Sequence, residues 1–566
     1  MIKVLLSILL TLLPILTSAD PVDINGIWYN LVPQTKEAEV TNNPNKYNGY
    51  IEIPASVTFS DIDYSVTSIG EFAFVHCSSL TSITIGNCLN SIGAQAFYGC
   101  TGLLSVNIPN SVISIGHEAF YGCSSLISID IPNSVTSIGH DAFFGTAWYN
   151  NQPNGLVYAG KVAYDFKGEM SDNTNISIKE GTLGIADYAF SRCNGLTSVT
   201  IPNSVTSIAP YAFEGCSGLT SIDMPNSLTS IGKFAFYGCF SLTSVTIPYN
   251  VTCIDISAFC NCHSLTSVSI PNSVTTIDEF AFSSCTSLTS VTISSSVTSI
   301  GYYAFSECPS LTSIMVEKDN PKYDSRNDCN AIIETSSNTL LFGCNSTFIP
   351  NSVTSIESDA FRGSALTSVT IPNSVTSIGR GAFYGCSALI SVTIPNSVTS
   401  IGNCAFEGCR GLTSVTIPNN VTNIYDFTFY GCRALTSVII GSGVGNLYSN
   451  SFSICTNLTD VYCLAENVPY TLNDAFDYTP CASATLHVPA VSLDAYKQTS
   501  PWSQFGRIVV LTDDDPSPTG INSLKADDIL SPEATYSLDG RHLFNPQRGM
   551  NIIRMSDGTA KKVIMR

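Results

Sequence analysis

LTSVTIPNSVTSIAPYAFEGCSG, residues 196–218, decides the fold because it recurs with small changes from near Val66 to beyond Phe476. Copies within a run follow one another every 23 residues, with one spacing of 22 and one of 24. A fixed period of this length predicts a solenoid in which each repeat forms one coil. The phenylalanines that mark the copies are Phe74, Phe97, Phe120, Phe143, Phe190, Phe213, Phe236, Phe259, Phe282, Phe305, Phe361, Phe383, Phe406, Phe429, Phe452 and Phe476.

The apolar residues of one copy predict two short strands and a turn. Val199 and Ile201 alternate with hydroxyl side chains, a period-two pattern that indicates a half-buried strand. Pro202 ends this strand because it has no N–H to donate. The run 205–208 predicts a second parallel ladder, and Ala212-Phe213 is expected to place the large core side chain on a single helical turn. Stacking these units predicts a β-rich solenoid of about 18 coils of 23 residues, with parallel β ladders and irregular caps.

The repeated pattern LxxVxIPxSVxxIGxxAFxxC resembles the BspA-like leucine-rich repeats, also called the Treponema pallidum type. The resemblance covers about three quarters of the chain. It implies a leucine-rich-repeat solenoid, a secreted or outer cell-surface location, and non-enzymatic binding roles such as adhesion to host proteins or to other cells.

Both ends of the chain carry segments that are expected to direct export. Residues 1–19 combine a short basic start, an apolar stretch and the small residues Thr17, Ser18 and Ala19, which predicts a signal peptide. No later segment has the length of a transmembrane helix. The tail at 535–566, with YSLDGR and GMNIIRMSDGTAKKVI, resembles the end of the C-terminal sorting domains that Bacteroidota proteins use in type IX secretion. A degenerate pair of strands is the alternative.

Between these ends we predict a cap at 20–65, the solenoid at 66–511 and a linker at 512–534. Two islands, at 147–183 and 317–348, interrupt the repeats. The first lies in a gap close to two periods long, so we expect one diverged coil there. The gap around the second exceeds two periods by ten residues, a surplus that should bulge from the stack. Such an insertion is either a tolerated surface loop or part of a binding face.

Composition limits the classes of partner. Charged residues are only 12% of the chain, against about a quarter in ordinary domains, and the formal net charge is −20. The repeats carry no basic stripe, so we expect no nucleic-acid partner and no binding to anionic lipid.

Thirteen of the 21 cysteines share one repeat position. Disulfide staples between coils would suit an exported protein, whereas buried thiols would act as small hydrophobes. The same position accepts Thr146 and Ser364, which favours the thiols. The thirteen are Cys77, Cys100, Cys123, Cys193, Cys216, Cys239, Cys262, Cys285, Cys308, Cys386, Cys409, Cys432 and Cys455.

The sequence contains no HExxH, GxSxG or P-loop motif, so we predict neither an enzyme nor a cofactor. His117 and His140 share a repeat position 23 residues apart, and Glu118 and Asp141 adjoin them, so stacked coils would bring potential metal ligands together. Other coils place lysine, tyrosine, arginine or asparagine at the histidine position, which is typical of a solvated face. We therefore predict no metal there.

A second group matches a structural zinc site in residue type. It consists of Cys253, Cys260, Cys262 and His263. Cys262 already belongs to the repeated cysteine position, and the spacing is not that of a known zinc ribbon. We predict no zinc site here either.

Surface residues remain as the candidates for binding extracellular or host proteins, or surface glycans. The first set, the strand face, consists of Ser198, Thr200, Ser221, Asp223, Ser244, Thr246, Ser267, Ser269, Ser290 and Thr292. These mostly hydroxyl side chains are able to hydrogen-bond either a protein or a glycan. The second set, the tyrosine row, consists of Tyr98, Tyr121, Tyr237, Tyr384 and Tyr430. Aromatic rings can stack on sugars or anchor a protein, and packing within the stack is the alternative for both sets.

Overall fold

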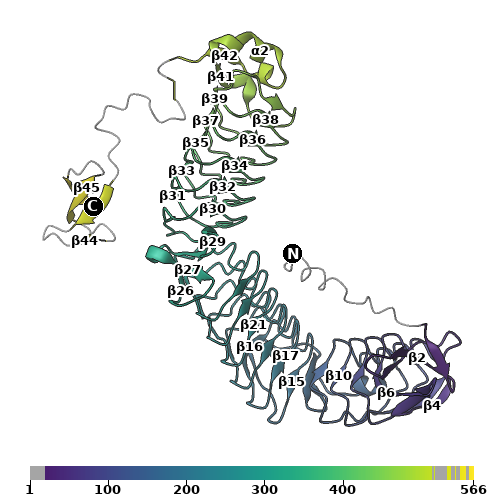
Figure 1. Ribbon diagram of the computed structural model, residues 1–566. Coiled ribbons are helices and arrows are strands. Elements are labelled where there is room, and N and C mark those ends of the chain that lie inside the picture. Colours follow the sequence, from purple (N-terminus) through teal and green to yellow (C-terminus); the bar gives the residue numbers. More distant parts are fainter. Residues whose placement is uncertain are drawn as a thin grey trace, which may run out of the picture. The chain divides into compact units, whose positions relative to one another are not determined.

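The computed structural model (Figure 1) describes residues 20–512 and 515–516, together with the backbone of four strands between 532 and 565. The predicted signal peptide and most of the predicted linker lie outside the described residues. Together the coils number about 19, each of about 23 residues, which confirms the predicted leucine-rich-repeat solenoid.

The chain divides into two compact units. The first contains the residues up to Ser374 and Ile378–Leu389, and the second contains Val375–Ser377 and Ile390–Arg566. The boundary falls at β32 (Ser377–Ile378). Each unit is a stack of coils, described below by itself.

The first predicted strand of the repeat is β16 (Leu196–Thr200), which pairs in parallel with the strands one coil before and one coil after it. Val199 lies opposite Ile222 and is buried, whereas Thr200 points outward. This column is the strand ladder. Its other members in the first unit are β4 (Gly49–Ile53), β7 (Leu80–Ile85), β9 (Ser105–Asn107), β14 (Thr174–Ser177), β18 (Ser221–Asp223), β20 (Val245–Thr246), β22 (Ser267–Ser269), β24 (Ser290–Ile293), β26 (Ser313–Val316) and β31 (Ser368–Thr370).

The second predicted ladder is also present. β17 (Ser207–Ile208) pairs in parallel with both neighbours, Ile208 lying opposite Ile185 and Ile231. The other strands of this column in the first unit are β6 (Ile62–Ile69), β8 (Ser91–Ile92), β10 (Ser114–Ile115), β11 (Ser137–Ile138), β15 (Gly184–Ile185), β19 (Ser230–Ile231), β21 (Cys253–Ile254), β23 (Thr276–Ile277), β25 (Ser299–Ile300) and β30 (Ser355–Ile356).

The segment that carries Phe213 forms turns, and the predicted helical turn is wrong. Tyr211 and Gly215 have φ angles of 57° and 69°, in the left-handed region that an α-helix excludes. Backbone N–H groups of these turns donate hydrogen bonds to carbonyls of the next coil. The Phe190 N–H donates to the Ala212 carbonyl at 2.8 Å, and the Phe213 N–H donates to the Ala235 carbonyl at 2.8 Å. Neighbouring coils therefore hydrogen-bond along a third column as well.

Phenylalanine rings fill the core between these columns. Phe190, Phe213, Phe236 and Phe259 are fully buried, and their rings stack at centroid distances of 5.0 to 5.2 Å. Aromatic side chains cover the ends of the column: Tyr47 lies 4.5 Å from Phe74 in the first unit.

The repeated cysteines are free thiols, in agreement with the prediction from Thr146 and Ser364. At least ten of the thirteen donate from Sγ to a phenylalanine carbonyl of the preceding coil at 2.9 to 3.4 Å, as Cys216 does to Phe190. Burial raises the pKa of Cys216, Cys239 and Cys262 well above the usual range of a thiol, and that of Cys308 to about 12. The column thus consists of small apolar groups that also satisfy a carbonyl.

Both islands lie within the first unit and begin with antiparallel strands. At the first, α1 (Ala147–Asn150) precedes β12 (Gly155–Ala159) and β13 (Val162–Lys167), which form a hairpin. β13 and β14 join the two ladders in parallel, which confirms the predicted diverged coil.

At the second island, β27 (Tyr323–Asp324), η1 (Arg326–Asp328), β28 (Ala331–Glu334) and β29 (Thr339–Gly343) follow one another, and β29 joins β30 in parallel. Ile332 and Ile333 are fully buried. The apolar side chains of this hairpin therefore pack into the core, whereas most residues of the segment 317–328 before it are exposed or half-buried.

The N-terminal part of the first unit starts with antiparallel strands. These are β1 (Val22–Ile24), β2 (Ile27–Val32), β3 (Glu37–Val40) and β5 (Ser56–Phe59). β3 then pairs in parallel with β6, which leads into the second ladder.

The second unit repeats the same two columns, which Figure 1 shows side by side. Its strand ladder consists of β33 (Ser391–Thr393), β35 (Ser414–Ile417), β37 (Ser437–Ile440), β39 (Asp460–Cys463), β41 (Thr485–Val488) and β42 (Arg507–Val510). Its second ladder consists of β34 (Ser400–Ile401), β36 (Asn423–Ile424), β38 (Asn446–Leu447) and β40 (Tyr470–Thr471). Short helices follow: η2 (Cys481–Ser483), η3 (Ala490–Ser492), α2 (Leu493–Gln498) and η4 (Trp502–Gln504). Trp502 packs 5.5 Å from Phe476.

The tail contains an antiparallel sheet in the order β44-β43-β45-β46, with bounds β43 (Pro532–Tyr536), β44 (His542–Leu543), β45 (Gly549–Met555) and β46 (Ala560–Met565). Within the described residues, no helix is both long and apolar enough to cross a membrane.

Candidate functional site

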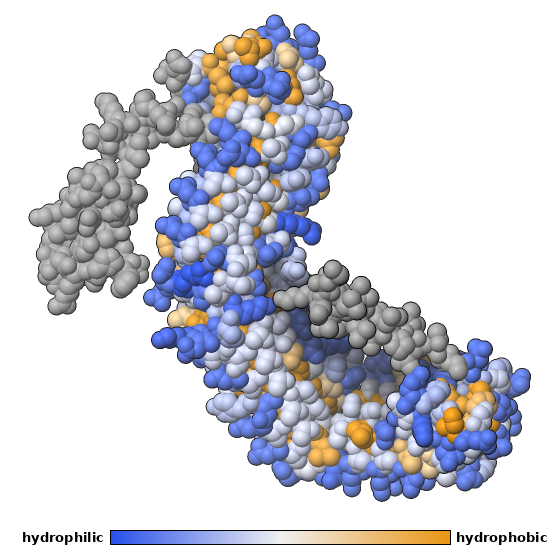
Figure 2. All heavy atoms as spheres, viewed as in Figure 1, coloured by the Kyte–Doolittle hydropathy of each residue, from blue (hydrophilic) through white to orange (hydrophobic). Residues whose placement is uncertain are grey.

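The residues of the strand face lie in, or directly beside, five consecutive strands of the strand ladder. Parallel pairing sets Ser198 opposite Ser221 and Ser267 opposite Ser290. Thr200, Ser221, Asp223, Ser244, Thr246, Ser267 and Ser269 are exposed, and Ser198, Ser290 and Thr292 are half-buried. Figure 2 shows the coils mostly in the pale colours of weakly hydrophilic residues, with scattered apolar positions. The face is therefore polar, sparsely charged and exposed.

A column of threonines beside the strand face is bound to the stack itself. Each threonine Oγ1 donates to a backbone carbonyl one coil earlier, at 3.0 to 3.3 Å. The column consists of Thr220, Thr243, Thr266, Thr289 and Thr312. These hydroxyls stabilise the contact between coils, whereas the strand face points to solvent.

The tyrosine row is divided among several environments and is half-buried throughout. The rings of Tyr98 and Tyr121 stack at 5.0 Å with planes 4° apart, so each covers a face of the other. Tyr384 lies under the guanidinium of Arg362, whose Cζ is 3.9 Å from the ring centroid. Tyr237 and Tyr430 each contact a phenylalanine edge-on, at 5.7 and 5.4 Å. Packing within the stack therefore occupies much of the ring surface.

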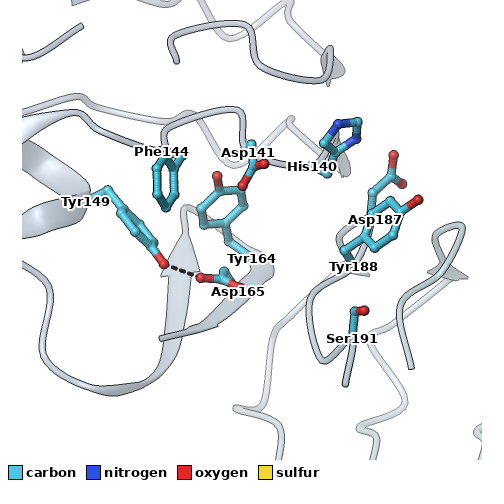
Figure 3. A pocket seen from close by; sticks show the side chains of 9 residues that line it. All are labelled: His140, Asp141, Phe144, Tyr149, Tyr164, Asp165, Asp187, Tyr188 and Ser191. Carbon is cyan, nitrogen blue, oxygen red and sulfur yellow. Dashed lines mark hydrogen bonds between the residues drawn. The ribbon is translucent and has the colours of Figure 1, made fainter. Parts of the chain in front are cut away.

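A cleft of about 260 Å³ lies at the first island, where the diverged coil meets its neighbours (Figure 3). Its lining includes His140, Asp141, Tyr164, Asp165, Asp187 and Tyr188. Figure 3 shows Asp141 beside Tyr164, and His140 facing the side on which Asp187 lies. With Tyr149, which also lines it, the cleft combines three carboxylates, an imidazole and three phenol rings.

Hydrogen bonds fix the floor of the cleft. The Tyr149 hydroxyl donates to the Asp165 carboxylate, and the Phe143 N–H donates to the Tyr164 hydroxyl at 2.9 Å. Lys167 is the lysine nearest to Asp165 in the sequence. It donates to three backbone carbonyls at the end of α1, at 2.7 to 3.0 Å. Its charge is therefore used to hold the helix end.

Burial raises the pKa of all three aspartates. The pKa of Asp187 rises to about 6, although His140 and His117 lower it in part. The pKa values of Asp141 and Asp165 also rise because of burial, opposed by His140 at Asp141 and by the Tyr149 hydrogen bond at Asp165. Burial in the cleft thus disfavours the charged form of all three carboxyls.

The predicted stacking of the two histidines is confirmed. The rings of His117 and His140 lie 5.2 Å apart with planes 1° apart. Ligand atoms of Glu118, His140 and Asp141 all lie within 4.8 Å of one another, a grouping of at least three potential metal ligands. Glu118 also accepts a hydrogen bond of 2.6 Å from the Gln95 side chain.

The cysteine-rich quartet does not form a comparable group among the described residues. Cys262 donates to the Phe236 carbonyl at 3.3 Å, and burial raises the pKa of both Cys253 and Cys260 to about 11. The ring of His263 stacks on Phe240 at 4.8 Å.

Two acids of the cleft, Asp165 and Asp187, are absent from the residues singled out in the sequence. Asp187 holds the repeat position of His117 and His140, three residues before the marking phenylalanine. Aligning across the island would have revealed it. Asp165 lies in the diverged coil, where the repeat gives no register.

Comparison with known proteins relates the repeats to a family. The family model described as BspA type leucine-rich repeat region matches residues 53–152, 163–273, 254–390, 338–459 and 376–499. Curated proteins gave no match.

Similar solved structures include three bacterial proteins. A leucine rich cell surface protein of Faecalibacterium prausnitzii is 28% identical, covers 79% of this chain and 95% of its own, and has a TM-score of 0.41. A leucine-rich repeat protein of Bacteroides ovatus is 27% identical over 80% and 99%, with a TM-score of 0.31. The pneumococcal vaccine antigen PcpA is 16% identical over 87% and 98%, with a TM-score of 0.38. Since the family model matches well over half of its residues, the chain belongs to the BspA-type leucine-rich-repeat family.

Proposed function

We propose that this chain is a non-enzymatic protein of the outer cell surface, or a secreted one, that adheres to extracellular or host proteins through the strand face. The observation that carries the proposal is the run of hydroxyl side chains on five consecutive strands, from Ser198 to Thr292, most of which are exposed and the rest half-buried. Parallel pairing fixes the spacing of these side chains, so the face is a preorganised array of hydrogen-bond donors and acceptors. The predicted signal peptide and sorting-like tail support export.

Glycan binding through the tyrosine row is the other function suggested by the sequence. Stacking on a sugar needs an open ring face. Neighbouring rings or Arg362 occupy faces of Tyr98, Tyr121 and Tyr384. The geometry therefore favours protein binding over glycan binding.

A binding experiment with matched surface variants tests the proposal. The chain from Asp20 onward is applied to arrays of extracellular-matrix proteins and of polysaccharides. One variant changes five exposed strand-face residues to lysine: Ser221, Ser244, Thr246, Ser267 and Ser269. The control changes five exposed threonines of the second-ladder side to lysine: Thr206, Thr229, Thr252, Thr275 and Thr298. Both variants carry the same added charge.

The proposal expects protein binding that the strand-face variant loses at least tenfold and the control variant retains. Equal loss in both variants would indicate a charge effect and contradict the assignment to this face. Binding to polysaccharides alone, retained in the strand-face variant, would contradict the proposal and direct attention to the tyrosine row.

A further inference from the structure

The group formed by Glu118, His140 and Asp141 is separate from the strand face and has no part in the proposed adhesion. Glu118 and Asp141 hold the same repeat position in neighbouring coils, with φ angles of 52° and 53°. The shared left-handed backbone projects both carboxylates from equivalent turns. His140 precedes Asp141 in the chain, so three ligands come from two adjacent turns.

We propose that Glu118, His140 and Asp141 bind one Zn²⁺ ion on the wall of the cleft. An imidazole with carboxylates is a ligand set that zinc accepts, and the mutual spacing within 4.8 Å lets all three reach one ion. Ca²⁺ and Mg²⁺ prefer oxygen ligands alone, so the imidazole favours zinc over them. Three protein ligands leave a fourth position for water.

Neighbouring residues support two of the three ligands. The ring of His117 stacks on His140 and restrains its orientation. The Gln95 side chain donates to Glu118, a contact of the kind that orients metal-binding carboxylates. Asp187 adds a further carboxylate on the side that His140 faces, which raises the local attraction for a cation.

The variety of residues at this repeat position in other coils does not weaken the site. A metal site needs its ligands in only two adjacent coils, and the diverged coil follows them directly. The variation at this position, which indicates a solvated face, occurs in coils that do not border the cleft.

Metal titration of the chain from Asp20 onward tests the proposal. After dialysis against a chelator, Zn²⁺ and Ca²⁺ are titrated by calorimetry into the parent chain, into His140→Ala, and into Glu118→Gln. The matched control is His263→Ala, which removes an exposed histidine of another coil. Circular dichroism verifies that each variant is folded, and Glu118→Gln serves if His140→Ala fails to fold.

Cobalt distinguishes this site from the cysteines, because thiolate ligands give Co²⁺ an intense near-ultraviolet charge-transfer band that nitrogen and oxygen ligands do not. We expect one Zn²⁺ per chain, affinity at least about tenfold lower in both site variants, an unchanged control, and a Co²⁺ complex without the sulfur band. Absence of saturable Zn²⁺ binding, equal affinity in the site variants, a sulfur band, or preference for Ca²⁺ would each overturn the proposal.

Discussion

At the first island, residues 147–183, aspartates of the island and of the coils on either side of it line a cleft, and Lys167 of the island donates to backbone carbonyls. At the second island, residues 317–348, the guanidinium of Arg362 in the coil that follows lies near two acids and two aromatic rings. Both islands open the same stack with an antiparallel hairpin. They differ in whether an arginine lies close to the neighbouring carboxylates.

Arg362 is the centre of the second arrangement. Its side chain lies 3.1 Å from the Glu307 carboxylate and 3.4 Å from that of Asp359, and it is 24% exposed. Its Cζ lies 3.9 Å from the Tyr384 ring centroid and 5.6 Å from that of Tyr303. This coil thus supplies its own cation.

The difference shows what each junction contributes. At the second island an arginine pairs with the carboxylates, so the arrangement stabilises the stack. At the first island the carboxylates are partly buried beside a histidine, which gives them the character of a functional site. Asp359 and Asp141 hold the same repeat position, two residues before the marking phenylalanine. Neighbouring side chains, and not the repeat itself, therefore give that position its role.

Removing the guanidinium should have the largest effect. Arg362→Ala leaves Glu307 and Asp359 without their ion pair and Tyr384 without its cation. We expect the free energy of unfolding to fall by about 2 to 3 kcal/mol, less than for a fully buried pair because the group is partly exposed. Urea unfolding measures the change. The control is Arg192→Ala, whose side chain is 81% exposed and lies 3.7 Å from Glu214, and it should change stability little. Similar losses in both variants would contradict the role given to Arg362.

The same substitution at an acid of each island should have opposite signs at pH 7. Asp359→Asn loses an ion pair and should destabilise by about 1 kcal/mol. Asp187→Asn removes a charge that burial disfavours and should stabilise by about 1 kcal/mol, a value discounted for partial exposure. Urea unfolding of the two variants side by side measures both. Destabilisation by both would show that the two junctions do not differ in this way.

The pH dependence of Asp187→Asn sharpens this comparison. The pKa of Asp187 is about 6 in the folded chain, against an ordinary value of 3.8 for an aspartate. The folded state therefore holds the proton more tightly, so the stability present below pH 3.8 is lost as pH rises through about 6. The gain from Asp187→Asn should be present at pH 7 and absent near pH 4. A gain that is independent of pH would have to arise from something other than this carboxyl.

The repeat made most of the fold predictable, because the same contacts recur in every coil. Val199 and Pro202 indicated where a strand lies and ends, and the 23-residue period indicated parallel stacking. The left-handed turns before Phe213 were mistaken for a helical turn. The position of Tyr211, two residues before the marking phenylalanine, can be tyrosine, phenylalanine, glutamate or aspartate in different coils. The residue type therefore does not indicate that its φ angle is positive.

The cleft was less predictable, since it arises from a contact between a regular coil and a diverged one. The histidine pair and its neighbouring acids followed from the period. Asp165 and Tyr164 come from β13, where the repeat is lost, so only the three-dimensional structure places them beside Asp141. The period predicts the structure that the coils share, but it does not predict the structure where a coil diverges from the repeat.

The smallest effect is expected where each island replaces the repeated cysteine by a hydroxyl residue. Thr146 Oγ1 donates to the Phe143 carbonyl at 2.7 Å and accepts from the Tyr149 N–H at 3.0 Å, which caps α1. Thr146→Ala should cost about 0.5 to 1 kcal/mol, as loss of a helix cap does.

Hydrogen exchange at the two junctions completes the comparison. Tyr149 forms part of the cleft floor, so Thr146→Ala should speed exchange at the Tyr149 amide and weaken the bond to Asp165. Ser364→Ala is the matched change: Ser364 donates to Asn345 at 2.8 Å, but Asn345 keeps a second donor in the Ala365 N–H. We expect exchange around Arg362 to stay unchanged, because its ion pairs do not involve the hydroxyl. Faster exchange around Arg362 than at Tyr149 would contradict the roles given to the two islands, a stabilising ion pair at the second and a functional site at the first.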